Sequence, residues 1–215
     1  QVEFDNDMND PKVYKLWQDG NSVGIFQFES QGMTNFMKEL KPDCLEDIIA
    51  GVSLYRPGPM DQIPRYIKNK KDPEHAEYTH SSLIPILKVT YGCMVYQEQV
   101  MQIVRDLAGY SLGRADLVRR AMGKKKLDVM AREREIFING QLDEDGNIVV
   151  PGCVRNGIDA ESANRIFDEM AEFAKYAFNK SHAAAYAVVS YRTAYLKAYY
   201  PAEFMAATLN SYLGN

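Results

Sequence analysis

The hydrophobic positions of this chain recur mainly at the three- and four-residue spacing of amphipathic α-helices. In the clearest example, a helix is predicted over residues 31–40, which Ser30 can cap and on which Met33, Phe36, Met37 and Leu40 share one face. The same spacing, bounded by cap and stop residues, predicts further helices over residues 11–19, 44–52, 94–108, 112–123, 126–139, 160–174, 180–199 and 201–212.

Between these segments the polar residues predict caps and turns. Asp43 is expected to cap the helix that starts near residue 44, and the Arg56–Pro59 stretch is expected to break the chain sharply. Residues 61–81 are polar and predict a segment that runs over the surface, outside the core. The Asp145-Gly146 pair predicts a small β-hairpin near residues 142–150. The fold class is therefore mainly α, with many helices and one small hairpin.

The predicted organisation is a single domain over residues 1–215, cut from a larger chain. Within it we expect a linker and entry helix over residues 1–20, a helical subdomain over 21–140, and a second helical subdomain over 141–215. Composition fits one substantial core, since 46% of the residues are hydrophobic and 25% are charged.

Charge is distributed unevenly. The net charge is only −4, yet residues 114–134 carry eight basic residues against three acidic ones. Such a basic segment can attract a polyanion. The alternative is a solvated helix surface held by ion pairs one turn apart.

The three cysteines lie far apart and form no CxxC pair, which indicates reduced thiols in a cytoplasmic protein and no metal site. No apolar run approaches ~18 residues, so no membrane span is predicted.

The most informative stretch runs from Phe178 to Tyr186. It places Lys180, Ser181 and His182 at the start of a helix built of small residues, where backbone N–H groups lack partners and anions bind well. A second basic cluster lies about sixty residues upstream, at Arg119-Arg120 and residues 124–126. Two separated cationic elements of this kind indicate a protein that binds phosphates.

Several blocks, in the same order, resemble one family: the bacterial replicative DNA polymerase III alpha subunit, a C-family polymerase. The blocks are distributed over nearly the whole chain; they are residues 24–30, 55–60, 91–103, 108–113, 117–126, 178–182 and 200–205. The chain departs from the family's pattern at Ala177 and Arg114, where the family commonly has glycine.

The resemblance implies a multi-helical fingers domain, which approaches the incoming nucleotide opposite the palm. It implies that the palm aspartates and the Mg²⁺ ions they bind lie outside these residues, so that this fragment binds no metal and is inactive alone. The implied partners are DNA primer–template, deoxynucleoside triphosphates, the palm of the same chain, and, through the longer chain, the sliding clamp and other replisome subunits. No membrane partner is implied.

Polymerisation is phosphoryl transfer, which needs cations that neutralise charge on the triphosphate. On this resemblance Arg119 and Arg120 are expected to bind the nucleotide, since arginine matches phosphate oxygens bidentately. The alternative is a surface arginine pair bridged to Asp116. Arg114, Lys124, Lys125 and Lys126 are expected to meet DNA.

Lys180, His182 and Asn179 are also expected at the nucleotide. His182 can donate to a phosphate or act as general acid, or it can simply cap its own helix or pack on Tyr186 one turn along. Asn179 can instead cap its helix. Tyr191, Tyr195 and Tyr199 share a stripe on which a base could stack, although a tyrosine stripe at this spacing more often belongs to the core. The rival functions are a non-catalytic helical module that binds nucleic acid, and a structural domain whose basic patch docks an acidic partner.

Overall fold

A computed structural model of the chain describes residues 2–124 and 126–213. The mainly α fold class is confirmed, since 67% of the structure is helical. The α-helices, in order, are α1 (Pro11–Gln18), α2 (Gln31–Leu40), α3 (Leu45–Leu54), α4 (Ile63–Lys71), α5 (Ile84–Leu87), α6 (Gln97–Ala108), α7 (Leu112–Gly123), α8 (Leu127–Asn139), α9 (Gly152–Arg155), α10 (Ala160–Phe173), α11 (Lys180–Tyr199) and α12 (Pro201–Leu213). Two short strands, β1 (Gln141–Leu142) and β2 (Ile148–Val150), lie between α8 and α9. Short 3₁₀ helices are formed by Pro59–Gln62, Pro73–His75, Ser81–Leu83 and Lys88–Thr90.

The chain divides into two compact units. Residues up to Tyr55, together with those from Ser181 onward, form what we call the terminal unit, and Arg56–Lys180 form the central unit. This division does not follow the expected boundaries at residues 20 and 140. It cuts α11 directly after its first residue, so Lys180 belongs to the central unit and the rest of α11 to the terminal unit.

Helices α1 and α2 pack together in the terminal unit, and their caps follow the sequence. The Asp10 carboxylate accepts a hydrogen bond from the backbone N–H of Lys12, and Ser30 Oγ accepts one from Met33 N–H. The four apolar residues on the predicted face of α2 are its buried residues. Around Trp17 and Tyr14, both buried, lie the rings of Phe28 and Tyr191.

The alanine face of α11 is covered by the terminal unit itself. Ala183, Ala187 and Ala194 are fully buried, and Ser190 Oγ donates to the carbonyl of Phe26 at 2.8 Å. Small side chains thus allow the chain to approach this helix closely.

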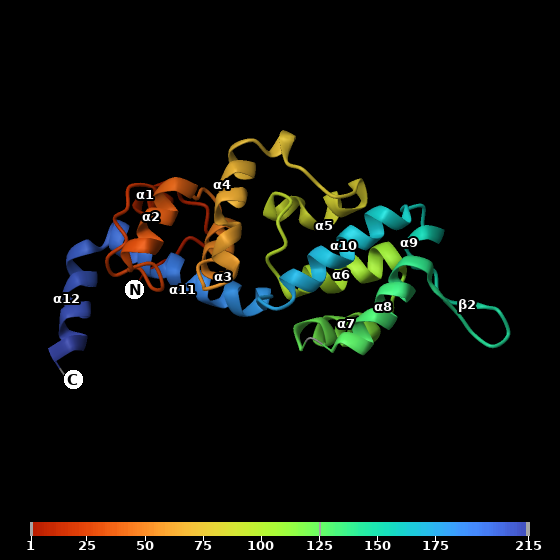
Figure 1. Ribbon diagram of the computed structural model, residues 1–215. Coiled ribbons are helices and arrows are strands. Elements are labelled where there is room, and N and C mark those ends of the chain that lie inside the picture. The colour runs from red at the N-terminus through yellow and green to blue at the C-terminus, as the bar shows by residue number, and fades with distance from the viewer. Residues whose placement is uncertain (1, 125, 214–215) are drawn as a thin grey trace. The chain divides into compact units, whose positions relative to one another are not determined.

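The core of the central unit lies among α6, α7, α8, α9 and α10, which pack on one another (Figure 1). Helix α6 ends at Gly109, whose φ of +78° is the left-handed conformation that favours glycine. After α8 the predicted hairpin is present, with β1 antiparallel to β2 and Gly146 in its turn at φ +82°. Figure 1 shows the hairpin extending away from the neighbouring helices of its unit.

Two local predictions are wrong. The N-cap of α3 is Cys44, not Asp43; the backbone N–H of Asp43 instead donates to the Asp47 carboxylate. Residues 61–81 do not merely run over the surface, because they contain α4, whose Tyr66 and Ile67 are buried. The polar composition of this segment hid a helix that buries only one narrow face.

Candidate functional site

The twin arginines lie on α7, a helix whose N-terminus is capped by Ser111. Asp116 precedes them by three and four residues, so all three side chains share one face. Arg119 donates through Nε and Nη2 to Asp116 Oδ1, at 3.1 and 2.7 Å, and Arg120 Nη2 lies 2.8 Å from Asp116 Oδ2. This arrangement is the alternative to nucleotide binding that the sequence predicted, a surface arginine pair bridged to Asp116.

The two arginines differ in exposure. The Arg119 side chain is 23% exposed and that of Arg120 is 52% exposed. The hydrogen bond from Arg119, and then the charges of both arginines, lower the pKa of Asp116 below its ordinary value of 3.8. Asp116 therefore stays negative at neutral pH, and this face keeps a net positive charge with Arg120 as its more accessible cation.

Arg119 also reaches the first turn of α6. Its Nη1 donates to Gln97 Oε1 at 3.2 Å. That turn is rigidly held, because the buried Gln99 side chain accepts from Val95 N–H and Tyr96 N–H through Oε1 and donates to Thr90 Oγ1.

The segment Phe178–Lys180 attaches to the same turn from the other side. Tyr96 and Phe178 form a parallel β-bridge, and Gln97 N–H donates to the Phe178 carbonyl at 2.9 Å. The Lys180 ammonium lies 5.2 Å from the centroid of the Tyr96 ring, a cation–π contact. Residues from two distant parts of the sequence thus meet at Tyr96–Glu98: Arg119 from one, and Phe178 and Lys180 from the other.

A carboxylate occupies the N-terminus of α11. Glu98 accepts the backbone N–H of Lys180 through both oxygens, at 3.2 and 3.0 Å, and Asn179 Nδ2 donates to Glu98 Oε1 at 2.9 Å. The sequence indicated that these N–H groups would face a phosphate. In this structure an anion of the protein itself takes that position.

His182 lies in the terminal unit, in contact with Tyr186. The two ring centroids are 4.4 Å apart at an interplanar angle of 50°. This contact is the packing alternative predicted from the sequence, while roles in phosphate binding or as general acid stay predictions.

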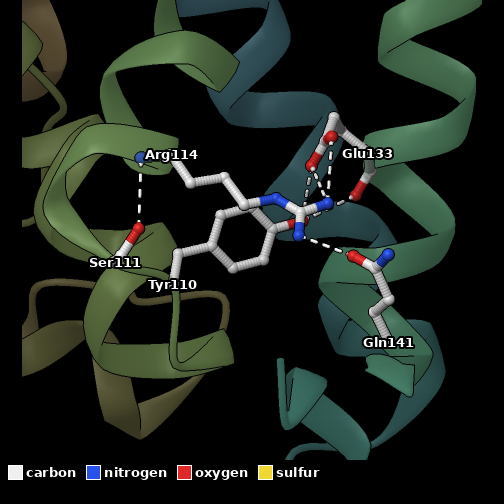
Figure 2. A network of polar contacts seen from close by, with 5 residues as sticks. All are labelled: Tyr110, Ser111, Arg114, Glu133 and Gln141. Atoms are coloured by element: carbon white, nitrogen blue, oxygen red, sulfur yellow. Dashed lines mark hydrogen bonds and ion pairs between the residues drawn. The ribbon is translucent and has the colours of Figure 1, made fainter. Parts of the chain in front are cut away.

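The residues expected to meet DNA have different environments. Lys124 and Lys126 are exposed at the junction of α7 and α8, and Lys125 lies outside the described residues. Arg114 is enclosed in a polar network, drawn in Figure 2: it donates to Gln141 Oε1 at 2.6 Å, pairs with Glu133 at 3.2 Å and stacks 5.0 Å from the Tyr110 ring centroid. Its part in DNA binding stays a prediction.

One group of potential metal ligands occurs among the described residues: Asp43, Cys44 and Asp47. Burial raises the pKa of the Cys44 thiol to about 11, so it keeps its proton, whereas metals bind the thiolate. In the acid-rich N-terminal segment, Asp5 instead accepts hydrogen bonds from Asn9 N–H and the Tyr191 hydroxyl. That residues 1–215 bind no metal stays a prediction.

Sequence reasoning missed the residues that join these elements, namely Gln97, Glu98 and Gln99. They belong to one of the blocks that carry the resemblance, but no pattern in the sequence tells which distant segment a polar side chain will contact.

No helix in residues 2–124 and 126–213 combines the length and the apolar character that crossing a membrane requires.

Comparison with known proteins places these features in a family. The family described as "Bacterial DNA polymerase III alpha subunit finger domain" matches residues 4–145. Proteins named DNA polymerase III subunit alpha are 52% identical in Thermus aquaticus and 53% identical in Xylella fastidiosa, each over 97% of this chain; one from Rickettsia prowazekii is 49% identical over 100% of it. The chain spans only 16–17% of the length of these relatives. With residues 4–145 matched and this identity along nearly its whole length, the chain belongs to the family of finger domains of the bacterial DNA polymerase III alpha subunit.

Proposed function

We propose that this fingers domain binds the triphosphate of the incoming deoxynucleotide during template-directed DNA synthesis in the bacterial cytoplasm. Arg120 and Lys180 are the direct phosphate ligands, and Arg119 and Asn179 adjoin them. The observation that carries the proposal is the attachment of both Arg119 and Lys180 to the turn Tyr96–Glu98. Cations from two distant segments are thereby held beside one short stretch of α6.

Each proposed ligand suits this task for a physical reason. Arginine stays charged at all relevant pH values and matches phosphate oxygens with its planar fork. The triphosphate carries several negative charges, so neutralising them is most of what the protein contributes to phosphoryl transfer. Lys124 and Lys126 extend the positive surface and, together with Lys125, help to hold primer–template.

The rest of the reaction belongs to the longer polymerase chain. Its palm supplies the carboxylates that bind Mg²⁺, and the metal stabilises the attacking and leaving oxygens. Contacts with the sliding clamp and other replisome subunits also run through that chain. Residues 1–215 alone are expected to incorporate no nucleotide on primed DNA with Mg²⁺, and incorporation above background by a pure sample would contradict the assignment.

The twin arginines test the proposal in the full-length polymerase. Arg120→Ala and Arg119→Ala should each lower kcat/KM by roughly ten- to hundredfold, the equivalent of about 1.5–3 kcal/mol. KM should rise for all four nucleotides alike, because they share one triphosphate. Lysine at either position should restore activity only partly, since it lacks the fork.

Arg105→Ala is the matched control, because Arg105 is an exposed arginine of α6 whose ion pair is with its neighbour Asp106. It should leave the kinetics unchanged. If both twin-arginine variants also stay within about twofold of wild type at fixed salt, the triphosphate assignment is wrong. Steep salt dependence of DNA binding with no response to nucleotide would favour the non-catalytic nucleic-acid module instead.

A further inference from the structure

Glu98 is a carboxylate in a place where the proposed function would put a phosphate. Its oxygens accept the Lys180 backbone N–H and the Asn179 side-chain amide, with distances from 2.9 to 3.2 Å. A carboxylate at a helix N-terminus stabilises the helix and satisfies N–H groups that would otherwise lack partners. The start of α11 is thereby fixed on the first turn of α6.

The backbone and the side chain of Lys180 contact different residues. The negative Glu98 is bound to the backbone of Lys180, while the Lys180 ammonium lies over the Tyr96 ring, 5.2 Å from its centroid. A triphosphate placed on the Lys180 N–H would meet the Glu98 charge at close range. Because Glu98 already accepts the Lys180 N–H, the segment offers an anion the Lys180 ammonium and not that N–H group.

We propose that Glu98 is a positioning residue for the nucleotide: it fixes the Phe178–Lys180 segment so that the Lys180 ammonium is presented beside the twin arginines. This inference rests on the proposed function of Lys180. Glu98 acts through Lys180 and does not touch the nucleotide. Tyr96 and Gln97 assist from the same turn, through the ring under the ammonium and the hydrogen bond to Phe178.

The test is a double-mutant cycle in the full-length polymerase, with Glu98→Ala, Lys180→Ala and the double variant. If Glu98 acts through Lys180, Glu98→Ala should raise KM for all four nucleotides by roughly five- to thirtyfold. The double variant should then match Lys180→Ala alone, because contacts that act in series do not add.

Glu98→Gln separates position from charge. Glutamine keeps an oxygen that can accept the Lys180 N–H, so KM should return to within about threefold of wild type. A purely structural role would not give this rescue in KM together with non-additivity toward Lys180. Asp106→Asn is the matched control on α6, since Asp106 is exposed and pairs with Arg105; it should leave KM unchanged.

The outcomes are distinguishable. An unchanged KM in Lys180→Ala would overturn the proposed function at Lys180. A raised KM in Lys180→Ala with an unchanged KM in Glu98→Ala would overturn only the positioning role. A lower KM in Glu98→Ala or Glu98→Gln would mean that the carboxylate competes with the triphosphate, which also overturns it. Additive effects in the double variant would show that Glu98 acts independently of Lys180.

Discussion

Helix α7 carries two arginine–carboxylate clusters that differ in their surroundings. At its first turn, Arg114 pairs with Glu133 of α8, and the two side chains are only 22% and 14% exposed. Near its last turn, Arg119 and Arg120 pair with Asp116 of the same helix, and Arg120 is 52% exposed. The sequence places all three arginines in one basic segment and gives them the same charge.

The two clusters differ in the partners of their arginines and not in charge, and under the proposed function this difference distinguishes a structural arginine from a phosphate-binding one. Arg114 joins three elements, since Glu133 lies on α8, Gln141 begins β1 and the Tyr110 ring lies beneath its guanidinium (Figure 2). Arg120 forms its ion pair with Asp116, one turn earlier on the same helix. An exposed pair of that kind costs little to open when a phosphate arrives.

The largest expected effect follows from breaking the enclosed cluster. Arg114→Ala leaves the Glu133 carboxylate largely buried without its cation, which should lower the local opening free energy by about 2–3 kcal/mol. Hydrogen exchange of peptides covering residues 110–150 in the full-length chain should accelerate accordingly. Arg114→Lys should not rescue, because lysine cannot donate to Glu133 and Gln141 as a planar fork does.

Arg120→Ala is the matched variant on the same helix. The opening free energy that hydrogen exchange gives for residues 110–150 should change by less than about 0.5 kcal/mol in this variant, while the nucleotide KM should rise. Equal loss of protection in the two variants would contradict the comparison. So would an Arg114→Ala enzyme with normal protection and reduced DNA affinity, which would support the DNA-binding role predicted for Arg114.

The difference between contacts within one helix and contacts with a distant segment also explains how much of the fold and of the site could be predicted from the sequence. Helices with a clear apolar face and a polar cap, such as α2 and α10, were predicted nearly to the residue, because both signals are local. The N-cap of α3 was not predicted correctly, because Asp43 and Cys44 are adjacent and only the geometry of the turn decides between them. Helix α4 was missed because it buries only Tyr66, Ile67 and Asn69, and charged residues flank them.

Long-range polar contacts set the limit for the site. The bridge from Asp116 to the arginines was foreseen because residues three and four apart meet on any helix. The attachment of Arg119 to Gln97, and of Lys180 to Glu98, spans 22 and 82 residues. Nothing in the periodicity of either segment encodes such a pairing.

A smaller effect is expected from Tyr110→Phe. The Tyr110 hydroxyl donates to Glu133 Oε2 at 2.9 Å, so phenylalanine removes one hydrogen bond to a charged group while keeping the ring under Arg114. The opening free energy of the same peptides should fall by about 1–2 kcal/mol, less than in Arg114→Ala. Burial raises the pKa of Tyr110 well above its ordinary value, so this contribution should not change between pH 6 and 9. A variant as protected as wild type would show that the ring alone holds Arg114.

The smallest expected effect concerns Asp116 and tells which arginine is held more tightly. Its folded pKa lies below 3.8, so the ion pairs stabilise α7 fully above that pH and are lost as the pH falls through the lower folded value. The hydrogen bond from Arg119 is the largest cause of the shift. A carboxyl-carbon NMR titration of residues 1–215 should therefore show the Asp116 pKa rising further in Arg119→Ala than in Arg120→Ala. That order would mark Arg119 as the arginine held by the protein and Arg120 as the one available to phosphate. The reverse order would exchange these roles, and Arg119→Ala should then have the larger effect on nucleotide KM.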